Sequence, residues 1–179
     1  LCDARLIAGG ELLRSENRRM MELLKPPLVM LDEYRLLSEV GLIFVDCGPE
    51  ASEHIVDKQM YDPIAVIHHH EFPQSHGERD LGTSALQDVR RDVAATSTIA
   101  ANYLLEQDLE PSEGLATALL YGIREETRGR VPRYSDTDRE VLEWLMPRAN
   151  LSLIGEIENS PLPSEYYADF TLALQSCVI

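Results

Sequence analysis

The stretch Ile64–His70, which reads IAVIHHH, indicates how this chain folds. Four apolar residues run without interruption before three histidines, and an unbroken apolar run is typical of a strand buried on both faces of a parallel sheet. The run Leu42–Val45 repeats the pattern and leads into Asp46, two residues before the breaker Gly48. Two such strands in succession predict an α/β domain built on a mainly parallel sheet.

Further elements follow from similar patterns on either side of these runs. Start and stop signals, such as Ser15 as an N-cap and Pro111 as a first helical residue, set their limits. We expect strands over 4–8 and 85–89, and helices over 15–24, 50–60, 93–106, 111–123, 135–146 and from 164 onward. Strands alternate with helices first and helices alone follow, so helices should flank the sheet on both faces.

The charge balance limits the classes of partner that this chain can bind. Of the 179 residues, 31 are Asp or Glu and 16 are Lys or Arg, for a formal net charge of −15. Proteins that coat nucleic acid need basic surface to displace counterions, so this balance argues against a long nucleic acid. No apolar run approaches the roughly 20 residues of a membrane span, and we expect no membrane partner. Three cysteines, an odd count, predict a reducing compartment, the cytoplasm.

The ends of the sequence bear on domain organisation. The first residue is Leu1 rather than a methionine, and the apolar segment 173–179 stops abruptly. We therefore expect residues 1–179 to be one domain taken from a longer protein.

The polar residues that follow the two apolar strands are the first candidates for a site. Ligands of open α/β sheets sit beyond the carboxyl ends of the strands, where Asp46 and His68–His70 would converge. A carboxylate and imidazoles at adjacent strand ends suit Mn²⁺, Zn²⁺ or Fe²⁺. His76 is a further candidate ligand. Two plainer interpretations stay open: Asp46 as a turn residue, and hydrogen-bonded histidines that fix a loop.

Two segments near helix ends add weaker signals. Gly122–Thr127 closes a helix with two acidic residues, which oppose the helix dipole unless a cation is bound; a solvated helix end is the alternative. Arg90 and Arg91 precede Ala94–Ser97 at a helix start, where backbone N–H groups and hydroxyls form a natural anion site. Ordinary helix capping explains that segment equally well.

Taken in order, five segments resemble the motifs of a known family. They read DCG at 46–48, AVIHHH at 65–70, DVR at 88–90, AATSTI at 94–99 and GIREET at 122–127. This order is similar to that of the DHH phosphoesterase superfamily, which includes RecJ exonucleases, oligoribonucleases and cyclic-dinucleotide phosphodiesterases. The resemblance covers most of the chain, from about residue 4 to 177. It implies the DHH-type α/β domain.

The resemblance implies a two-metal hydrolysis, usually with Mn²⁺. Asp46 matches the Asp that bridges the metals, His69 matches a metal ligand, and His70 matches the His near the phosphate. Glu126 occupies the place of a ligating Asp, and His68 replaces the Asp of the Asp-His-His motif. The family's first metal-binding motif would lie upstream of residue 1, and its C-terminal substrate-binding domain would follow residue 179.

The leading expectation is a Mn²⁺-dependent phosphoesterase that hydrolyses a phosphodiester in a small nucleotide, either a short oligonucleotide or a cyclic dinucleotide. The expected metal ligands are acidic and imidazole side chains: Asp46, His68, His69 and Glu126. The expected catalytic residues are His69 and His70. The expected substrate-binding residues are His70, Arg90, Thr96 and Ser97.

Two alternatives remain. The departures at His68 and Glu126 favour a catalytically degenerate DHH domain that acts as a nucleotide-binding or protein-interaction regulatory module. A zinc or iron site built from His68, His69 and His76 is the other. A homodimer is compatible with each of these.

Overall fold

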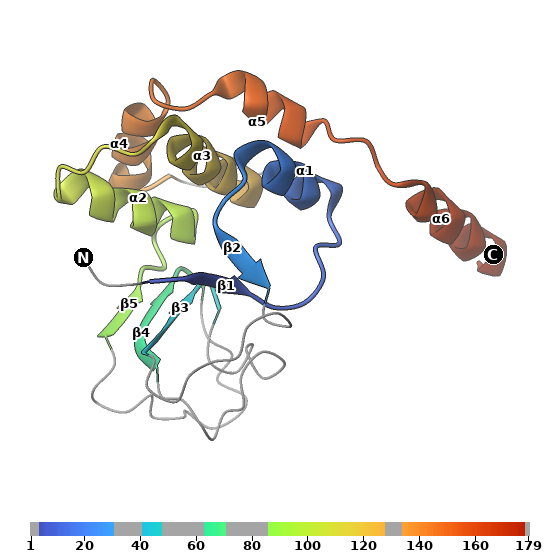
Figure 1. Cartoon of the computed structure of the whole chain (residues 1–179), viewed down its shortest axis with the longest axis horizontal. Coiled ribbons are helices and arrows are strands. Elements are labelled where there is room, and N and C mark those ends of the chain that lie inside the picture. The colour runs from blue at the N-terminus through green and yellow to red at the C-terminus, as the bar shows by residue number, and fades with distance from the viewer. Residues whose placement is uncertain (1–3, 31–40, 48–62, 71–85, 128–133, 178–179) are drawn as a thin grey trace.

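The described strands form two small parallel sheets, which lie below the packed helices in Figure 1. A computed structural model describes residues 4–30, 41–47, 63–70, 86–127 and 134–177 (Figure 1). Strands β1 (Leu6–Ala8) and β2 (Leu28–Met30) pair in one sheet. The second sheet has the order β3-β4-β5, with β3 at Leu42–Val45, β4 at Pro63–His68 and β5 at Leu86–Val89. The described strands are parallel, so the α/β class with a parallel sheet is confirmed.

Helices gather on one side of these strands (Figure 1). Their bounds are Ser15–Leu24 for α1, Thr96–Glu106 for α2, Glu113–Thr127 for α3, Asp136–Leu145 for α4, Leu151–Glu158 for α5 and Ser164–Ser176 for α6. Helices α1 to α5 pack together, whereas α6 stands apart at the end of an extended connection (Figure 1). The helix expected over 50–60 lies outside the described residues. None of the described helices is long and apolar enough to cross a membrane.

Several helix starts differ from the predicted ones. The prediction of Ser15 as an N-cap is wrong: Arg14 is the N-cap of α1, and Ser15 is already helical. Helix α2 begins at Thr96 rather than near 93, since Ala95 is still extended with φ −154°. Helix α3 begins at Glu113 rather than at Pro111.

Two elements were not predicted. Strand β2 has only three residues, too few to show the alternation of apolar and polar residues that predicts a strand. Helix α5 begins after Asn150, whose side chain accepts a hydrogen bond from the Leu153 N–H, and it buries Ile154 and Ile157. Asn is a preferred N-cap, so this signal was present in the sequence.

The core lies among helices α2 to α5. Its buried side chains are Ala95, Ala101, Ala116, Leu120, Tyr121, Ile123, Val141, Leu145, Ile154 and Ile157. Helices α2 and α3 approach so closely that a Cβ added at Gly122 would lie 2.3 Å from the Ser97 Oγ. This packing fixes the start of α2, which faces the carboxyl ends of β3 and β4.

Candidate metal centre

The candidate centre forms where β3 and β4 end side by side. The Val45–Ile67 register places Asp46, directly after β3, beside the residues that follow β4. The Asp46 N–H donates to the Ile67 carbonyl at 2.9 Å, which extends the strand pairing by one residue. Asp46 then turns into the left-handed region with φ 60°. The predicted convergence of Asp46 with the histidine run is therefore observed.

Three side chains share this edge of the sheet. One ligand atom from each of Asp46, His69 and His70 lies within 4.8 Å of the others. The His69 Nε2 is 3.6 Å from the Asp46 Oδ1, and the two imidazole centroids are 3.7 Å apart. Asp46 and His70 are exposed, whereas His69 is 8% exposed. Within the described residues this is a three-ligand group open to solvent on one side.

The buried nitrogen of His69 is left without a hydrogen bond. Its Nε2 has no hydrogen-bond partner among the described residues, because 3.6 Å from Asp46 is too long for one. A buried polar atom without a hydrogen bond destabilises the folded protein, and native protein interiors rarely contain one. A metal ion between His69 and Asp46 would satisfy this nitrogen.

The pKa of His69 is lowered from its ordinary value. Burial is the largest cause, and the neighbouring His70 adds to it, while Asp46 and Glu126 oppose the shift. A lowered pKa keeps the imidazole neutral near neutral pH, which is the form that binds metal.

Thr96 orients the carboxylate of Asp46. Its hydroxyl donates to the Asp46 Oδ1 at 2.6 Å, across 50 residues of sequence. Thr96 is the first residue of α2 and is buried, so the helix start holds this side chain in place. Sequence reasoning placed Thr96 on the substrate and missed this contact, since nothing in the local sequence reveals a partner so distant.

His68 lies apart from the three-ligand group. Its ring is buried, and its Nδ1 accepts a hydrogen bond from the His70 N–H at 2.8 Å. The ring thus fixes the turn that presents His69 and His70, which matches the plainer interpretation of hydrogen-bonded histidines in a loop. His76, the third histidine of the zinc or iron alternative, lies outside the described residues.

Glu126 and Ser97 are also not brought into the group. Glu126 is exposed in the last turn of α3, yet its charge is close enough to raise the pKa of His69 against the effect of burial. The Ser97 Oγ faces the backbone of Gly122 on α3. Its observed role is helix packing at the start of α2.

Arg90 is engaged in a separate network. Its Nε and Nη2 donate to the Asp88 carboxylate at 3.0 and 2.9 Å, and its Nη1 donates to the Asn102 Oδ1 at 2.6 Å. The Arg90 guanidinium is the largest cause of the lowered pKa of Asp88, and the Tyr103 hydroxyl adds to it. The Arg90 N–H also donates to the His68 carbonyl at 3.0 Å. The Arg90 side chain therefore supports the strand ends. The sequence did contain a signal for its pairing with Asp88, because residues two apart in an extended segment lie on the same face.

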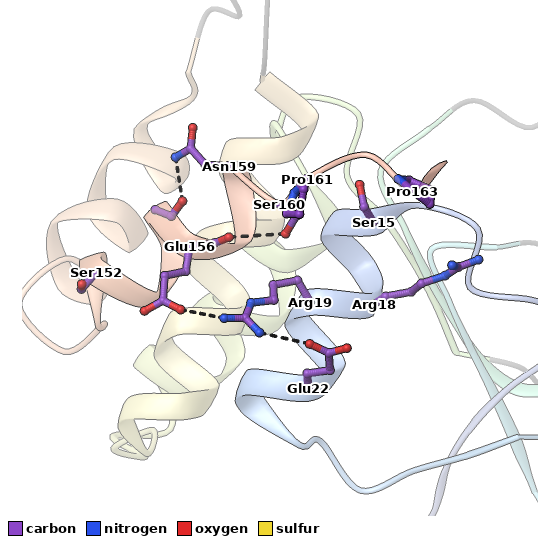
Figure 2. A pocket seen from close by; sticks show the side chains of 11 residues that line it. Ser15, Arg18, Arg19, Glu22, Ser152, Glu156, Asn159, Ser160, Pro161 and Pro163 are labelled. Atoms are coloured by element: carbon purple, nitrogen blue, oxygen red, sulfur yellow. Dashed lines mark hydrogen bonds and ion pairs between the residues drawn. The ribbon is translucent and has the colours of Figure 1, made fainter. Parts of the chain in front are cut away.

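A second concave region lies between α1 and α5 (Figure 2). Arg19 spans it, with hydrogen bonds to Glu22 at 3.1 Å and Glu156 at 3.0 Å. None of the residues that line it belongs to the three-ligand group. The guanidinium of Arg19 is paired with two carboxylates, and the residues that line this region offer no comparable set of metal ligands.

Comparison with known proteins shows a similarity to a protein of unknown role in an archaeon. The chain is 31% identical over 163 residues to an uncharacterized protein of Methanocaldococcus jannaschii, a match that covers 91% of this chain and 32% of the relative. The chain thus spans about a third of the length of the curated relative it matches. No family model matches the chain.

Proposed function

We propose that this chain is the metal-binding domain of a phosphoesterase that hydrolyses a phosphodiester in a small nucleotide. The observation that carries the proposal is the buried Nε2 of His69, which has no hydrogen-bond partner among the described residues and lies beside Asp46 and His70, at the shared carboxyl end of two parallel strands. The motif order that resembles the DHH phosphoesterases supports the same reaction. We propose Mn²⁺ as the metal and the cytoplasm as the compartment, the latter from the cysteine usage.

The donor set fits a borderline divalent cation. Two imidazoles and a carboxylate suit Mn²⁺, Fe²⁺ and Zn²⁺, and the open side of the group leaves room for water and a phosphate oxygen. A cation held by these residues would lower the pKa of a bound water and polarise a phosphoryl oxygen. Asp46 supplies the one negative charge of the group.

Thr96, His69 and His70 have separate roles in this proposal. Thr96 holds the Asp46 carboxylate by its 2.6 Å hydrogen bond, so that the ligand does not have to be ordered when the metal arrives. His69 presents a neutral nitrogen from the interior. His70, exposed beside it, would complete the ligand group with one ring nitrogen and donate a hydrogen bond to the phosphate from the other.

The charge of the whole chain limits the substrate. At −15 the average surface repels polyanions, and a long nucleic acid would need many phosphate contacts that 16 Lys and Arg do not readily supply. A dinucleotide or a cyclic dinucleotide needs only a local cation. This supports a small nucleotide as the substrate.

Metal titration tests the site directly. We expect Mn²⁺ to bind the full-length protein in a calorimetric titration, and D46N to weaken binding at least about 100-fold, because it removes the anionic ligand. D169N is the matched control, since Asp169 is exposed on α6, away from the group. Equal affinity in D46N and the unmodified protein would remove Asp46 from the site.

Turnover tests the reaction. We expect a di-adenylate to be hydrolysed in the presence of Mn²⁺ and to survive in a chelator. H69Q should abolish hydrolysis, whereas D169N should not alter it. Competition by Zn²⁺ and Fe²⁺ in the same titration identifies the preferred metal.

A second function has its own support. The group holds a single carboxylate, Glu126 lies outside it, and His68 stands where the resembling family has an Asp. These features favour a degenerate domain that binds a nucleotide or a protein partner without hydrolysis. Binding of the di-adenylate without turnover, with or without Mn²⁺, would support this regulatory module.

A further inference from the structure

A buried carboxylate joins the start of α2 to the start of α4. Asp138 is 0% exposed and lies in the first turn of α4. On its own helix it accepts the Ser135 N–H at 2.9 Å and the Ser135 hydroxyl at 2.8 Å. Across the interface it accepts the Ala94 N–H at 3.0 Å and the Thr98 hydroxyl at 2.8 Å.

The contacts to α2 go beyond what capping of α4 requires. A capping box needs only the reciprocal bonds between Ser135 and Asp138. Full burial of a carboxylate is costly unless its oxygens are satisfied, and here two of the four donors come from the other segment. Asp138 thus serves two helices at once.

Helix α2 lacks the usual devices at its own start. Its N-cap is Ala95, which offers no side-chain hydrogen bond, and its first turn contains no acidic residue. The negative charge of Asp138 lies at this helix start, where it also complements the helix dipole. Asp138 therefore fixes the start of α2 from outside the helix.

The fixed segment carries the contact to the candidate metal centre. Ala94 and Thr98 lie two residues to either side of Thr96, whose hydroxyl donates to the Asp46 Oδ1 at 2.6 Å. We propose that Asp138 is a positioning residue for this centre: it holds the start of α2, and through Thr96 it sets the direction of the Asp46 carboxylate. The inference rests on the proposed metal site.

Two variants test the connection. D138N removes the charge and turns one acceptor into a donor that faces N–H and O–H groups, and T98V removes one α2 donor without a change of shape. We expect both to weaken Mn²⁺ binding by the full-length protein about tenfold, the lower end of the effects of residues that orient metal ligands. We also expect both to shift the amide resonances of Thr96 and Asp46 in the metal-free protein.

Two controls separate positioning from loss of charge or stability. D136N removes a carboxylate from the same turn of α4, where Asp136 is solvent-exposed and pairs with Arg139. N150A removes the N-cap of α5 and destabilises the domain at a distance from the centre. Both should keep the Mn²⁺ affinity and the Thr96 and Asp46 resonances of the unmodified protein.

The outcomes distinguish this inference from the proposed function. Folded D138N or T98V with unchanged Mn²⁺ affinity and unchanged resonances would overturn the positioning role, as would an equal loss of affinity in N150A. If D138N does not fold, T98V decides. If the unmodified protein binds no Mn²⁺, the proposed function fails, and the resonances of Thr96 and Asp46 alone decide whether Asp138 positions them.

Discussion

Replacing Gly122 with alanine should destabilise the domain, although alanine is the better helix former. The new Cβ would lie 2.3 Å from the Ser97 Oγ, and 3.2 Å from the Ser97 Cβ. Ordinary contacts of such atoms begin near 3.4 Å, so the oxygen must move by about 1 Å or push the two helices apart. Ser97 is in the first turn of α2, next to the buried Thr96, and its Cβ would stay 3.2 Å from the new Cβ even if its hydroxyl rotated away.

The expected magnitude is a difference of two terms. Alanine in a helix interior is favoured over glycine by about 0.8–1 kcal/mol. Overpacking of a tight contact costs about 1–3 kcal/mol. We therefore expect the free energy of unfolding of G122A to fall by up to about 2 kcal/mol.

A double-mutant cycle isolates the contact. S97A removes the oxygen and leaves only the 3.2 Å approach of two carbons, so the double variant S97A/G122A should recover most of the loss. Gly155 in α5 is the matched control, because an added Cβ there has nothing within 4 Å, and G155A should be neutral or stabilising. Urea unfolding of each variant, followed by tryptophan fluorescence, gives the free energies. A gain of stability in G122A equal to that in G155A would refute the reasoning.

Three further predictions concern the strand ends. T96V should weaken Mn²⁺ binding about tenfold with little change in stability, measured by calorimetry, because the Asp46 carboxylate loses its 2.6 Å hydrogen bond; unchanged affinity would contradict it. H68D should keep the turn, because a carboxylate can accept the His70 N–H in place of the imidazole Nδ1. It should also strengthen Mn²⁺ binding and raise any phosphodiesterase rate, since it adds an anion beside the ligand group, and a rate that stays flat or falls would count against the degenerate-motif argument. The lowered pKa of Asp88 means that the unfolded chain binds more protons at this group, so its contribution to stability is full above pH about 4 and is lost as the pH falls through the folded-state pKa. D88N should therefore lower the urea midpoint at pH 7 and flatten its decline toward pH 3, and parallel profiles of D88N and the unmodified protein would show that Arg90 does not hold this carboxylate.

The strands that carry the candidate centre were predictable because their signal is local. The unbroken apolar runs before Asp46 and the histidines predict the strands, their carboxyl ends and the parallel pairing. The expected burial on both faces is wrong for β3, in which Ile43 and Val45 are 56% and 51% exposed. The convergence of Asp46, His69 and His70 required only that β3 and β4 be neighbours, which the structure confirms.

What the sequence could not supply is the choice of partner for each polar side chain. Arg90 binds Asp88 and Asn102, Thr96 binds Asp46, and His68 binds the backbone two residues on. Each of these contacts depends on where a helix start lies relative to a strand end, to within an ångström. Motif order alone assigns the residue types and leaves these pairings undetermined.

The isolation of α6 has a consequence for folding cooperativity. Its residues are all exposed, including Tyr166, Tyr167 and Phe170. A helix of 13 residues in water is close to the balance point between helix and coil, because nucleation is unfavourable and the described elements add few tertiary contacts to it. In this chain α6 would therefore melt gradually and outside the main transition, so that circular dichroism shows a sloping native baseline while tryptophan fluorescence, from Trp144 in α4, reports a single sharp step.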